Sequence, residues 1–409
     1  MRWAAADHRT SPVGYLFSPA SCYPSPVAYV VDHHGAVVHS WSHRAHQPRP
    51  EDDPPNYLRG WNHVEMDAAG NLFAIVPLRS LIKLTPTSEL AWSCDVTAHH
   101  DLALTANGTV MVLAEAPRLV EAGKVSTVVL DNAIATITAA GVMTAELSLY
   151  DLLRTDRGLR DLIDTAIHWR STAFRLRGWP SPSDAVPDAV ADETLTILRT
   201  GRYDGDPRRA SQLLRALPGS PCDILHTNTL EVLAAHPGGL WSCGDMLACM
   251  RELNVIAVIS PSSHAVRWWW GPGELSGPHQ PTMLPDGSIL VFDNGRDQQR
   301  TRLVVVEPTT SRVTWRWTAQ PPESFFCPLA GGCEPLPNGN LLVTNSTAGA
   351  AFELTWQGRV VWRLTLPVEV YGADRGRVSI YRMSGVPVEI LDELTLGKHA
   401  GGDAVGANA

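Results

Sequence analysis

A pattern that recurs about every 50 residues constrains the fold of this chain more than any other feature. The first half of each copy reads as two short apolar strands around a tight turn, and most copies close on tryptophan. The copies span residues 28–41, 81–92, 133–143, 256–268, 303–315 and 352–362. Units of this kind must stack against each other, because one small sheet cannot bury its own apolar face.

The second half of each copy reads as two strands joined by an Asn-Gly or Asp-Gly type of turn, which is a strong hairpin signal. Clear copies surround Gly70, Gly108, Gly287 and Gly339, and a modified copy surrounds Gly244. Two hairpins per unit form a four-stranded antiparallel sheet, and radial repetition of such sheets forms a β-propeller. The sequence therefore predicts an all-β fold, a six-bladed β-propeller of four-stranded antiparallel blades.

The glycine-turn hairpins are one too few for six blades. We expect the first blade to take its inner strands from residues 14–17, from the C-terminal segment, or from both, which closes the ring. Most tryptophans are expected to pack between blades, because large aromatic side chains dominate core energetics. Residues 1–397 are predicted to form this single domain, and residues 398–409 a disordered tail.

Residues 150–222 interrupt the repeat. Apolar residues at Leu159, Leu162, Ile163 and Ile167 have helical spacing, a Pro-rich loop follows, and a second helix is expected near 208–215. We interpret this arginine-rich stretch as an inserted, partly helical segment between two blades. It is either a solvated surface excursion or a lid over one mouth of the central channel.

Composition excludes several classes of protein. With 44% hydrophobic and 18% charged residues, the chain has material for a core and is not disordered as a whole. The net charge of −9 argues against a nucleic-acid partner. No apolar stretch is long enough for a membrane span, and the first eight residues lack the apolar core of a signal peptide, so a cytoplasmic location is expected. Nothing indicates an oligomeric state.

Histidines precede the predicted inner strands of different blades at matching positions. His100 lies eight residues before Gly108, and His279 lies eight residues before Gly287. His226 opens the inner strand of a third blade. Because the inner strands of a propeller surround the central channel, we predict that these three histidines form a functional cluster there.

Three neighbouring residues are weaker or different candidates. His63 and His99 lie beside matching positions, and a structural role is the favoured interpretation for both. Arg251 ends an otherwise apolar hairpin in the same blade as His226. A buried guanidinium without a partner is costly, so Arg251 is expected to reach a partner or the channel.

This set of side chains suits an anion such as sulfate or phosphate. Arginine supplies paired donors, and histidine acts as donor or nucleophile. The alternative is that His100, His226 and His279 bind zinc, iron or copper. The sequence has no P-loop, GxGxxG, HExxH or GxSxG motif, so no cofactor is expected beyond that alternative metal ion.

At these residues the sequence resembles the arylsulfate sulfotransferase (arylsulfotransferase) family, over residues 14 to 366. Each motif is weak alone, and the set is specific. The motifs are His99-His-Asp with Asn107-Gly, His226-Thr-Asn228, Arg251-Glu-Leu-Asn-Val-Ile, Gly271-Pro-Gly-Glu-Leu, Gly277-Pro-His-Gln-Pro, Phe292-Asp-Asn-Gly295 and Leu336-Pro-Asn-Gly-Asn.

The resemblance implies a six-bladed propeller that moves a sulfuryl group from an aryl sulfate to a phenol through a sulfated histidine, without a nucleotide donor. It implies that His279 is the nucleophile and that His100, His226 and Arg251 hold the sulfuryl oxygens. The implied substrate-binding residues are Asn228, His99, His63, Gln280 and Asn294. Two alternatives stay open: a different enzyme on this scaffold, metal-dependent or not, and a non-catalytic propeller that binds a ligand.

Overall fold

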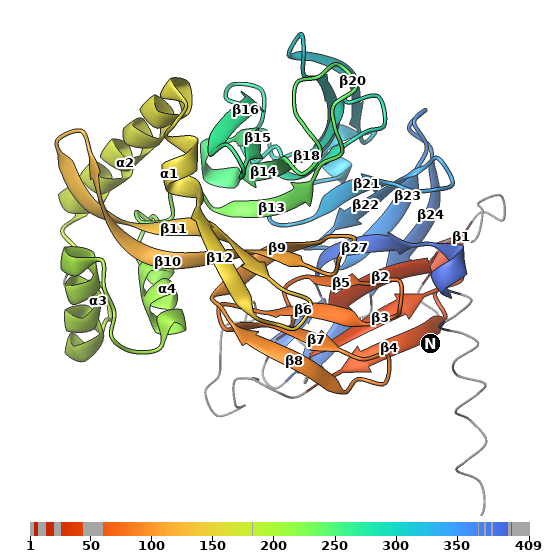
Figure 1. The fold of residues 1–409 in the computed structure, drawn as a ribbon, viewed down its shortest axis with the longest axis horizontal. Helices are drawn as coiled ribbons and strands as arrows, with labels where there is room; N and C mark the ends of the chain where they lie inside the picture. Colours follow the sequence, from red (N-terminus) through yellow and green to blue (C-terminus); the bar gives the residue numbers. More distant parts are fainter. Residues whose placement is uncertain are drawn as a thin grey trace, which may run out of the picture.

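Six four-stranded antiparallel sheets stand around a ring in the computed structural model (Figure 1). The structure describes residues 4–6, 14–19, 26–43, 60–181, 183–366, 368–371, 374–377, 379–391 and 394. The predicted six-bladed propeller is therefore confirmed, whereas the predicted tail at 398–409 lies outside the described residues. No helix among these residues is long and apolar enough to cross a membrane.

Each blade runs from an inner strand at the channel to an outer strand at the rim. One blade consists of β5 (Val64–Met66), β6 (Leu72–Val76), β7 (Ser80–Leu84) and β8 (Leu90–Asp95). The next consists of β9 (Ala98–Leu104), β10 (Val110–Ala122), β11 (Val125–Ile137) and β12 (Met143–Ser148). A third consists of β13 (Thr227–Val232), β14 (Met246–Met250), β15 (Val255–Ser260) and β16 (Ala265–Trp270).

Two further blades follow in the same order. The first consists of β17 (His279–Met283), β18 (Ile289–Asp293), β19 (Arg302–Glu307) and β20 (Arg312–Thr318). The second consists of β21 (Gly332–Pro335), β22 (Leu341–Asn345), β23 (Ala350–Leu354) and β24 (Val360–Thr365), with β1 (Ala4–Ala6) added on its outer edge. A separate hairpin pairs β25 (Val368–Tyr371) with β26 (Asp374–Arg377).

The ring closes where the two ends of the chain share one blade. The C-terminal strand β27 (Ile380–Val386) is its inner strand, and β2 (Gly14–Pro19), β3 (Val27–Val31) and β4 (Val37–Ser42) follow outward. Both expected sources therefore contribute, β2 from residue 14 onward and β27 from the C-terminal segment. Closure leaves the inner strands of all six blades around one channel, which positions the site described below.

Outer-strand tryptophans fasten neighbouring blades together, as the repeat predicts. Their indole Nε1–H groups donate to a backbone carbonyl in the outer turn of the next blade, over 2.7–3.1 Å. The pairs are Trp92–Ala139, Trp268–Pro308, Trp315–Trp356 and Trp362–His33. This bond satisfies the polar end of the indole while its ring packs in the core between the sheets.

The interruption of the repeat contains four helices: α1 (Leu149–Leu153), α2 (Arg157–Arg177), α3 (Asp188–Thr200) and α4 (Pro207–Ala216). The helix α2 begins where the Asp156 side chain accepts from the Leu159 N–H, and it ends at Gly178 with a φ of +68°. It buries Leu159, Ile163 and Ile167, as the apolar spacing predicts. The sequence analysis missed α1 and α3.

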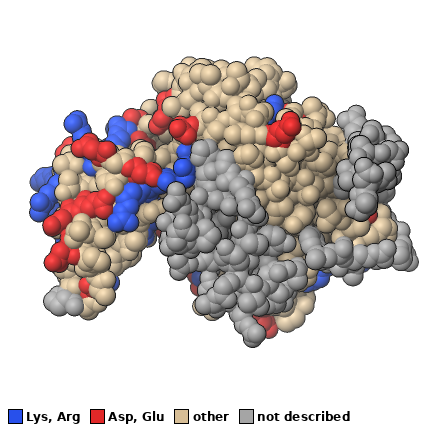
Figure 2. Space-filling model, turned by 90° about the horizontal axis from the view of Figure 1, so that it is seen from below, with Lys and Arg blue, Asp and Glu red and all other residues tan. Residues whose placement is uncertain are grey.

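A long hairpin supports these helices. Strands β10 and β11 stay paired from Val110–Ile137 to Ala122–Val125, well beyond the blade (Figure 1). Val128 and Leu130 of β11 pack there against Ile197 of α3 and Leu214 of α4. Lys, Arg, Asp and Glu side chains gather on this lobe, whereas the neighbouring blade surface in Figure 2 carries few. We refer to α1–α4 with the loop that leads toward β13, residues 149–225, as the helical insert.

Candidate functional site

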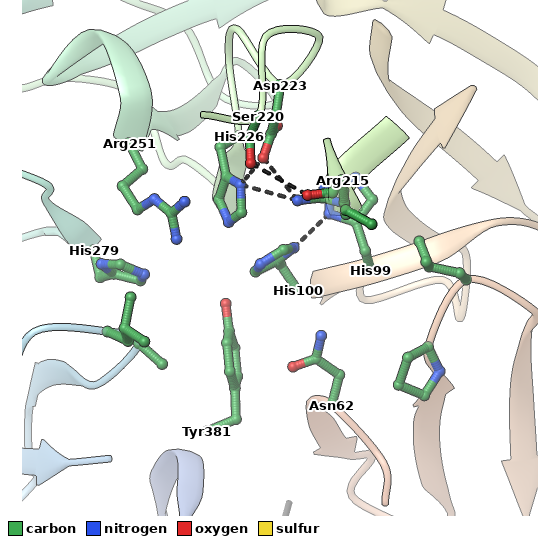
Figure 3. A pocket seen from close by; sticks show the side chains of 15 residues that line it. Asn62, His99, His100, Arg215, Ser220, Asp223, His226, Arg251, His279 and Tyr381 are labelled. Atoms are coloured by element: carbon green, nitrogen blue, oxygen red, sulfur yellow. Dashed lines mark hydrogen bonds and ion pairs between the residues drawn. The ribbon is translucent and has the colours of Figure 1, made fainter. Parts of the chain in front are cut away.

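A cavity of about 560 Å³ lies where the inner strands meet (Figure 3). All six blades contribute to it, and so does the helical insert. The lining residues are Asn62, Pro77, Leu78, His99, His100, Arg215, Ala216, Ser220, Asp223, His226, Arg251, His279, Leu329, Ala330 and Tyr381. The structure therefore brings the predicted set His100, His226, Arg251 and His279 together in one cavity.

The strand ladders explain why residues so distant in sequence converge. The residue pairs that flank the glycine turns between the first two strands of four blades are Met66–Leu72, Leu104–Val110, Val232–Met246 and Met283–Ile289. The inner-strand residues four positions earlier are Asn62, His100, Asn228 and His279. His226 thus stands two residues before the equivalent position of its blade, yet it still reaches the cavity.

Strained backbone is concentrated around this cavity. Leu78, His100, His226 and Ala330 line it with φ values of +57°, +58°, +47° and +51°. A left-handed conformation in a residue with a Cβ costs on the order of 1–3 kcal/mol and is found preferentially at functional sites. Both cavity histidines on this list are held by their blades in a conformation that local propensity alone does not favour.

The ring of His279 is fixed by Asn294. Asn294 donates from Nδ2 to the backbone oxygens of Cys327 (2.7 Å) and Ala330 (2.9 Å), so its Oδ1 must be the atom facing His279. That Oδ1 lies 2.7 Å from His279 Nδ1, which therefore carries the proton. Burial, and then the charge of Arg251, lower the pKa of His279 to about 3. At neutral pH the imidazole is uncharged and its Nε2 carries a lone pair.

The ring of His226 is fixed in the same way by a carboxylate. Its Nδ1 lies 2.5 Å from Asp223 Oδ2, a distance that requires a proton between the two atoms. Its Nε2 is buried at the cavity and has no protein partner. Burial, followed by the charges of Arg251 and Arg215, holds the pKa of His226 well below its usual value. His226 therefore also presents an unprotonated Nε2.

His99 and His100 form a pair of contacting rings next to His226. Their Nδ1 atoms lie 2.6 Å apart, so one ring donates to the other. The His100 ring stands edge-on to His226, with centroids 4.7 Å apart. Burial first, and then His226, keep the pKa of His100 well below its usual value. His99 lines the cavity as well as contacting His100.

Arg251 is one of two arginines that line the cavity, the other being Arg215. Its Nε donates to Glu252 Oε1 over 2.9 Å. Burial raises the pKa of Glu252, but the charges of Arg251 and Arg170 outweigh burial and lower this pKa to about 2. Glu252 therefore stays ionised and orients one edge of the guanidinium, leaving donors of Arg251 for the cavity (Figure 3).

The other predicted binding residues do not line the cavity. Asn228 donates to Pro278 O over 2.9 Å, and Gln280 donates its backbone N–H to Thr229 Oγ1 over 3.0 Å. His63 faces Glu65 Oε1 at 2.9 Å and Asp101 Oδ1 at 3.4 Å. Asn294 acts through His279, as described above. The structure thus gives these four residues protein partners and brings none of them into the lining.

Comparison with known proteins matches part of this chain to a described family. The model of the arylsulfotransferase (ASST) family matches residues 209–366, which include His226, Arg251 and His279. The chain resembles arylsulfotransferases over this part and folds as a β-propeller. The match supports a sulfotransferase-type function and therefore a transferase. No curated protein matches the sequence.

Several solved structures are similar to this arylsulfotransferase-like chain at low identity. A protein of unknown function from Bacteroides caccae shares 13% identity at a TM-score of 0.48, covering 92% of this chain and 99% of that one. A periplasmic gluconolactonase of Pseudomonas aeruginosa shares 12% sequence identity at a TM-score of 0.44, and the match covers 92% of this chain and 100% of that one. A virginiamycin B lyase of Staphylococcus aureus shares 12% sequence identity at a TM-score of 0.38, and the match covers 79% of this chain and 83% of that one.

Sequence reasoning missed five polar residues of the cavity: Asn62, Tyr381, Arg215, Ser220 and Asp223. Tyr381 occupies the inner-strand position of the closing blade, four residues before Gly385, which pairs with Tyr15. That position is recognisable only once the C-terminal strand is assigned to the first blade. Arg215 and Asp223 belong to the helical insert, which has no repeat against which to align them. The Asp223-Ile-Leu-His226 spacing is the one local signal.

Proposed function

We propose that this propeller transfers a sulfuryl group from an aryl sulfate to a phenol through a covalent adduct on His279. One observation carries the proposal: His279 is buried and neutral, its Nδ1–H is committed to Asn294, and its Nε2 shares the cavity with Arg251. Asn294 keeps the lone pair on the nitrogen that faces the cavity. A neutral imidazole so oriented is a competent nucleophile.

In the first half-reaction, the lone pair of His279 Nε2 attacks sulfur. The S–O bond to the aryl group breaks, and the phenolate leaves with the electron pair of that bond. Arg251 binds the sulfuryl oxygens and counters the charge of the group in transit. His279 holds the sulfuryl group on Nε2 after the phenol departs.

In the second half-reaction, an acceptor phenol attacks the same sulfur. His226 Nε2, unprotonated and unpartnered in the cavity, takes the phenolic proton as the new S–O bond forms. The N–S bond then breaks and its electron pair returns to His279. His226 then releases the proton to solvent, and the phenolate that left in the first half-reaction takes one from solvent, so the cycle balances.

The walls of the cavity favour aromatic substrates. Beside the polar cluster lie Pro77, Leu78, Ala216, Leu329 and Ala330, which offer an apolar surface to an aryl ring. The anionic end of an aryl sulfate then points toward Arg251. We propose small aryl sulfates and phenols as the partners, with the reaction in the cytoplasm.

Steady-state kinetics with a chromogenic aryl sulfate test this proposal. Phenol release should depend on an added acceptor phenol, and double-reciprocal plots at several acceptor concentrations should be parallel, as a ping-pong route requires. His279→Ala should fold and lose transfer completely. Full activity of His279→Ala, or release that depends on an added metal ion, would overturn the nucleophile assignment and favour the metal-dependent alternative.

A further inference from the structure

Arg215 of α4 connects the helical insert to His226. Its guanidinium forms two hydrogen bonds with the Glu115 carboxylate, one of them 3.0 Å between Nε and Oε1. Its Nη1 also lies 2.8 Å from Asp223 Oδ2, the oxygen that accepts the proton of His226 Nδ1. Glu115 is fully buried, so both ends of this arrangement are held in place. One side chain of the insert thus fixes the carboxylate that orients His226.

Arg170 of α2 connects the helical insert to Glu252, the carboxylate that orients Arg251. Its Nη1 donates to the backbone oxygens of Ser220 (3.1 Å) and Asp223 (3.0 Å). Its Nη2 donates to Glu252 Oε2 over 2.5 Å, and Glu252 Oε1 in turn accepts from Arg251 Nε. Arg170 therefore supports both the loop that carries Asp223 and the carboxylate that orients Arg251.

The chemistry of these contacts requires guanidinium groups. Each arginine serves acceptors on two different segments at once, from donors set at fixed angles in one plane. A lysine ammonium carries the same charge but cannot span both partners in a defined geometry. Substitution by lysine therefore separates the charge from the positioning.

We propose that Arg170 and Arg215 are positioning residues through which the helical insert completes the transfer site. Arg215 holds Asp223, and with it the Nδ1-protonated tautomer of His226. Arg170 holds Glu252, and with it the guanidinium of Arg251. This inference rests on the function proposed above and goes beyond it, because it makes the insert a built part of the site instead of a cover over the channel. The charged and titratable groups facing His226 are Asp223, Arg215, Arg251, Glu252, His99 and His100.

Nitrogen NMR of the histidine-labelled protein tests the first contact without relying on activity. The His226 signals are assigned by their loss in His226→Gln. We expect wild type to show protonated Nδ1 and bare Nε2, and Arg215→Lys to populate the other tautomer. Arg209→Gln is the matched control, since Arg209 lies on the same helix and pairs with Glu193 of α3. Unchanged His226 signals in both Arg215→Lys and Arg215→Gln would overturn the proposal.

Kinetics then separate the two arginines. Arg215→Lys should lower kcat about 10- to 100-fold with an ordinary phenol, and far less with an acidic phenol that is already ionised, because the ionised acceptor needs no base. Arg170→Gln should raise KM for the aryl sulfate more than it lowers kcat, because Arg251 loses its orientation. An equal loss with both phenols would mean that Arg215 has only a structural role.

These outcomes are distinguishable from failure of the proposed function itself. If wild type neither turns over aryl sulfates nor forms an adduct, sulfuryl transfer is wrong, and the NMR comparison still decides whether Arg215 sets the tautomer. If wild type is active while both arginine variants match the Arg209→Gln control, sulfuryl transfer stands and the positioning proposal falls. Circular dichroism on each variant identifies any loss that comes from unfolding.

Discussion

At the scale of single residues, the site is defined by which nitrogen of each imidazole carries its proton. Asn294 and Asp223 each accept from an Nδ1–H and thereby leave the Nε2 of His279 and of His226 bare. The two acceptors differ in charge, and so do the proposed tasks. A neutral amide suits a nucleophile that must stay uncharged, whereas a carboxylate stabilises the imidazolium that a general base becomes.

Substitution of Asn294 tests the tautomer argument for His279. Asn294→Leu removes the nearer acceptor of Nδ1–H and leaves the weaker contact with Gly277 O at 3.2 Å, so we expect transfer to fall by about 10- to 100-fold while the fold survives. Asn294→Asp keeps an acceptor, but its charge raises the pKa of His279 above the native value of about 3. Its activity should therefore decline at acid pH, where wild type is still active. The pH dependence of kcat/KM for both variants is the measurement.

At the scale of elements, the propeller depends on tight turns that touch the neighbouring blade. Gly287, in the turn between β17 and β18, has a φ of +87°, and a Cβ there would lie 2.6 Å from His236 Nε2. The His236 ring packs on Trp241 and accepts from the Gly238 N–H, so it cannot yield easily. Gly339 has the equivalent place in the next blade, with a φ of +83°, and a Cβ there would meet nothing within 4 Å.

These two glycines form a matched pair. Gly339→Ala should lower the free energy of unfolding by about 1 kcal/mol, the cost of a left-handed alanine. Gly287→Ala carries the same cost and should lose about 1–3 kcal/mol more, because it overpacks the contact between blades. Urea unfolding of the two variants measures the difference. Equal losses would show that the turn conformation, and not the contact, sets the requirement for glycine.

The repeat made most of the architecture predictable, because a closing tryptophan marks most blades and a turn glycine marks five of the six. It also placed His100 and His279 correctly, since both occupy the repeated position. Tyr381 was not predicted because its strand pairs with a strand at the other end of the chain. Arg215 was not predicted because its partner Glu115 lies 100 residues away, on a hairpin extension that belongs to no repeat. Long-range contacts outside the repeat have no local signature in one sequence.

At the scale of the whole molecule, the central channel buries ionisable groups with opposite effects on stability. Burial lowers the pKa values of its histidines, to about 3 for His63 and for His279. Below pH 6.5 these histidines take up protons in the unfolded chain but stay unprotonated in the folded chain, so stability falls as pH drops. Burial also raises the pKa values of Glu65 and Glu334 to about 7 and that of Glu231 to about 8. These carboxyls cost stability as pH rises above 4.5.

Glu231→Gln separates these two effects. The amide cannot ionise, yet it keeps an oxygen for the Met283 N–H, which donates to Glu231 Oε1 over 3.3 Å. We expect the stability gained over wild type to be at least about 2 kcal/mol larger at pH 8 than at pH 5, where the native carboxyl is still protonated. Urea unfolding at both pH values checks this. An equal change at both would mean that Glu231 ionises freely in the channel.

The central claim is that His279 carries the sulfuryl group between donor and acceptor. The most direct test is the intact mass of the protein after incubation with a chromogenic aryl sulfate in the absence of an acceptor phenol. The account predicts one added sulfuryl group per chain, located by peptide mapping on His279, absent from His279→Ala and lost when a phenol is added. An adduct on another residue, or phenol release with no adduct at any time, would contradict it.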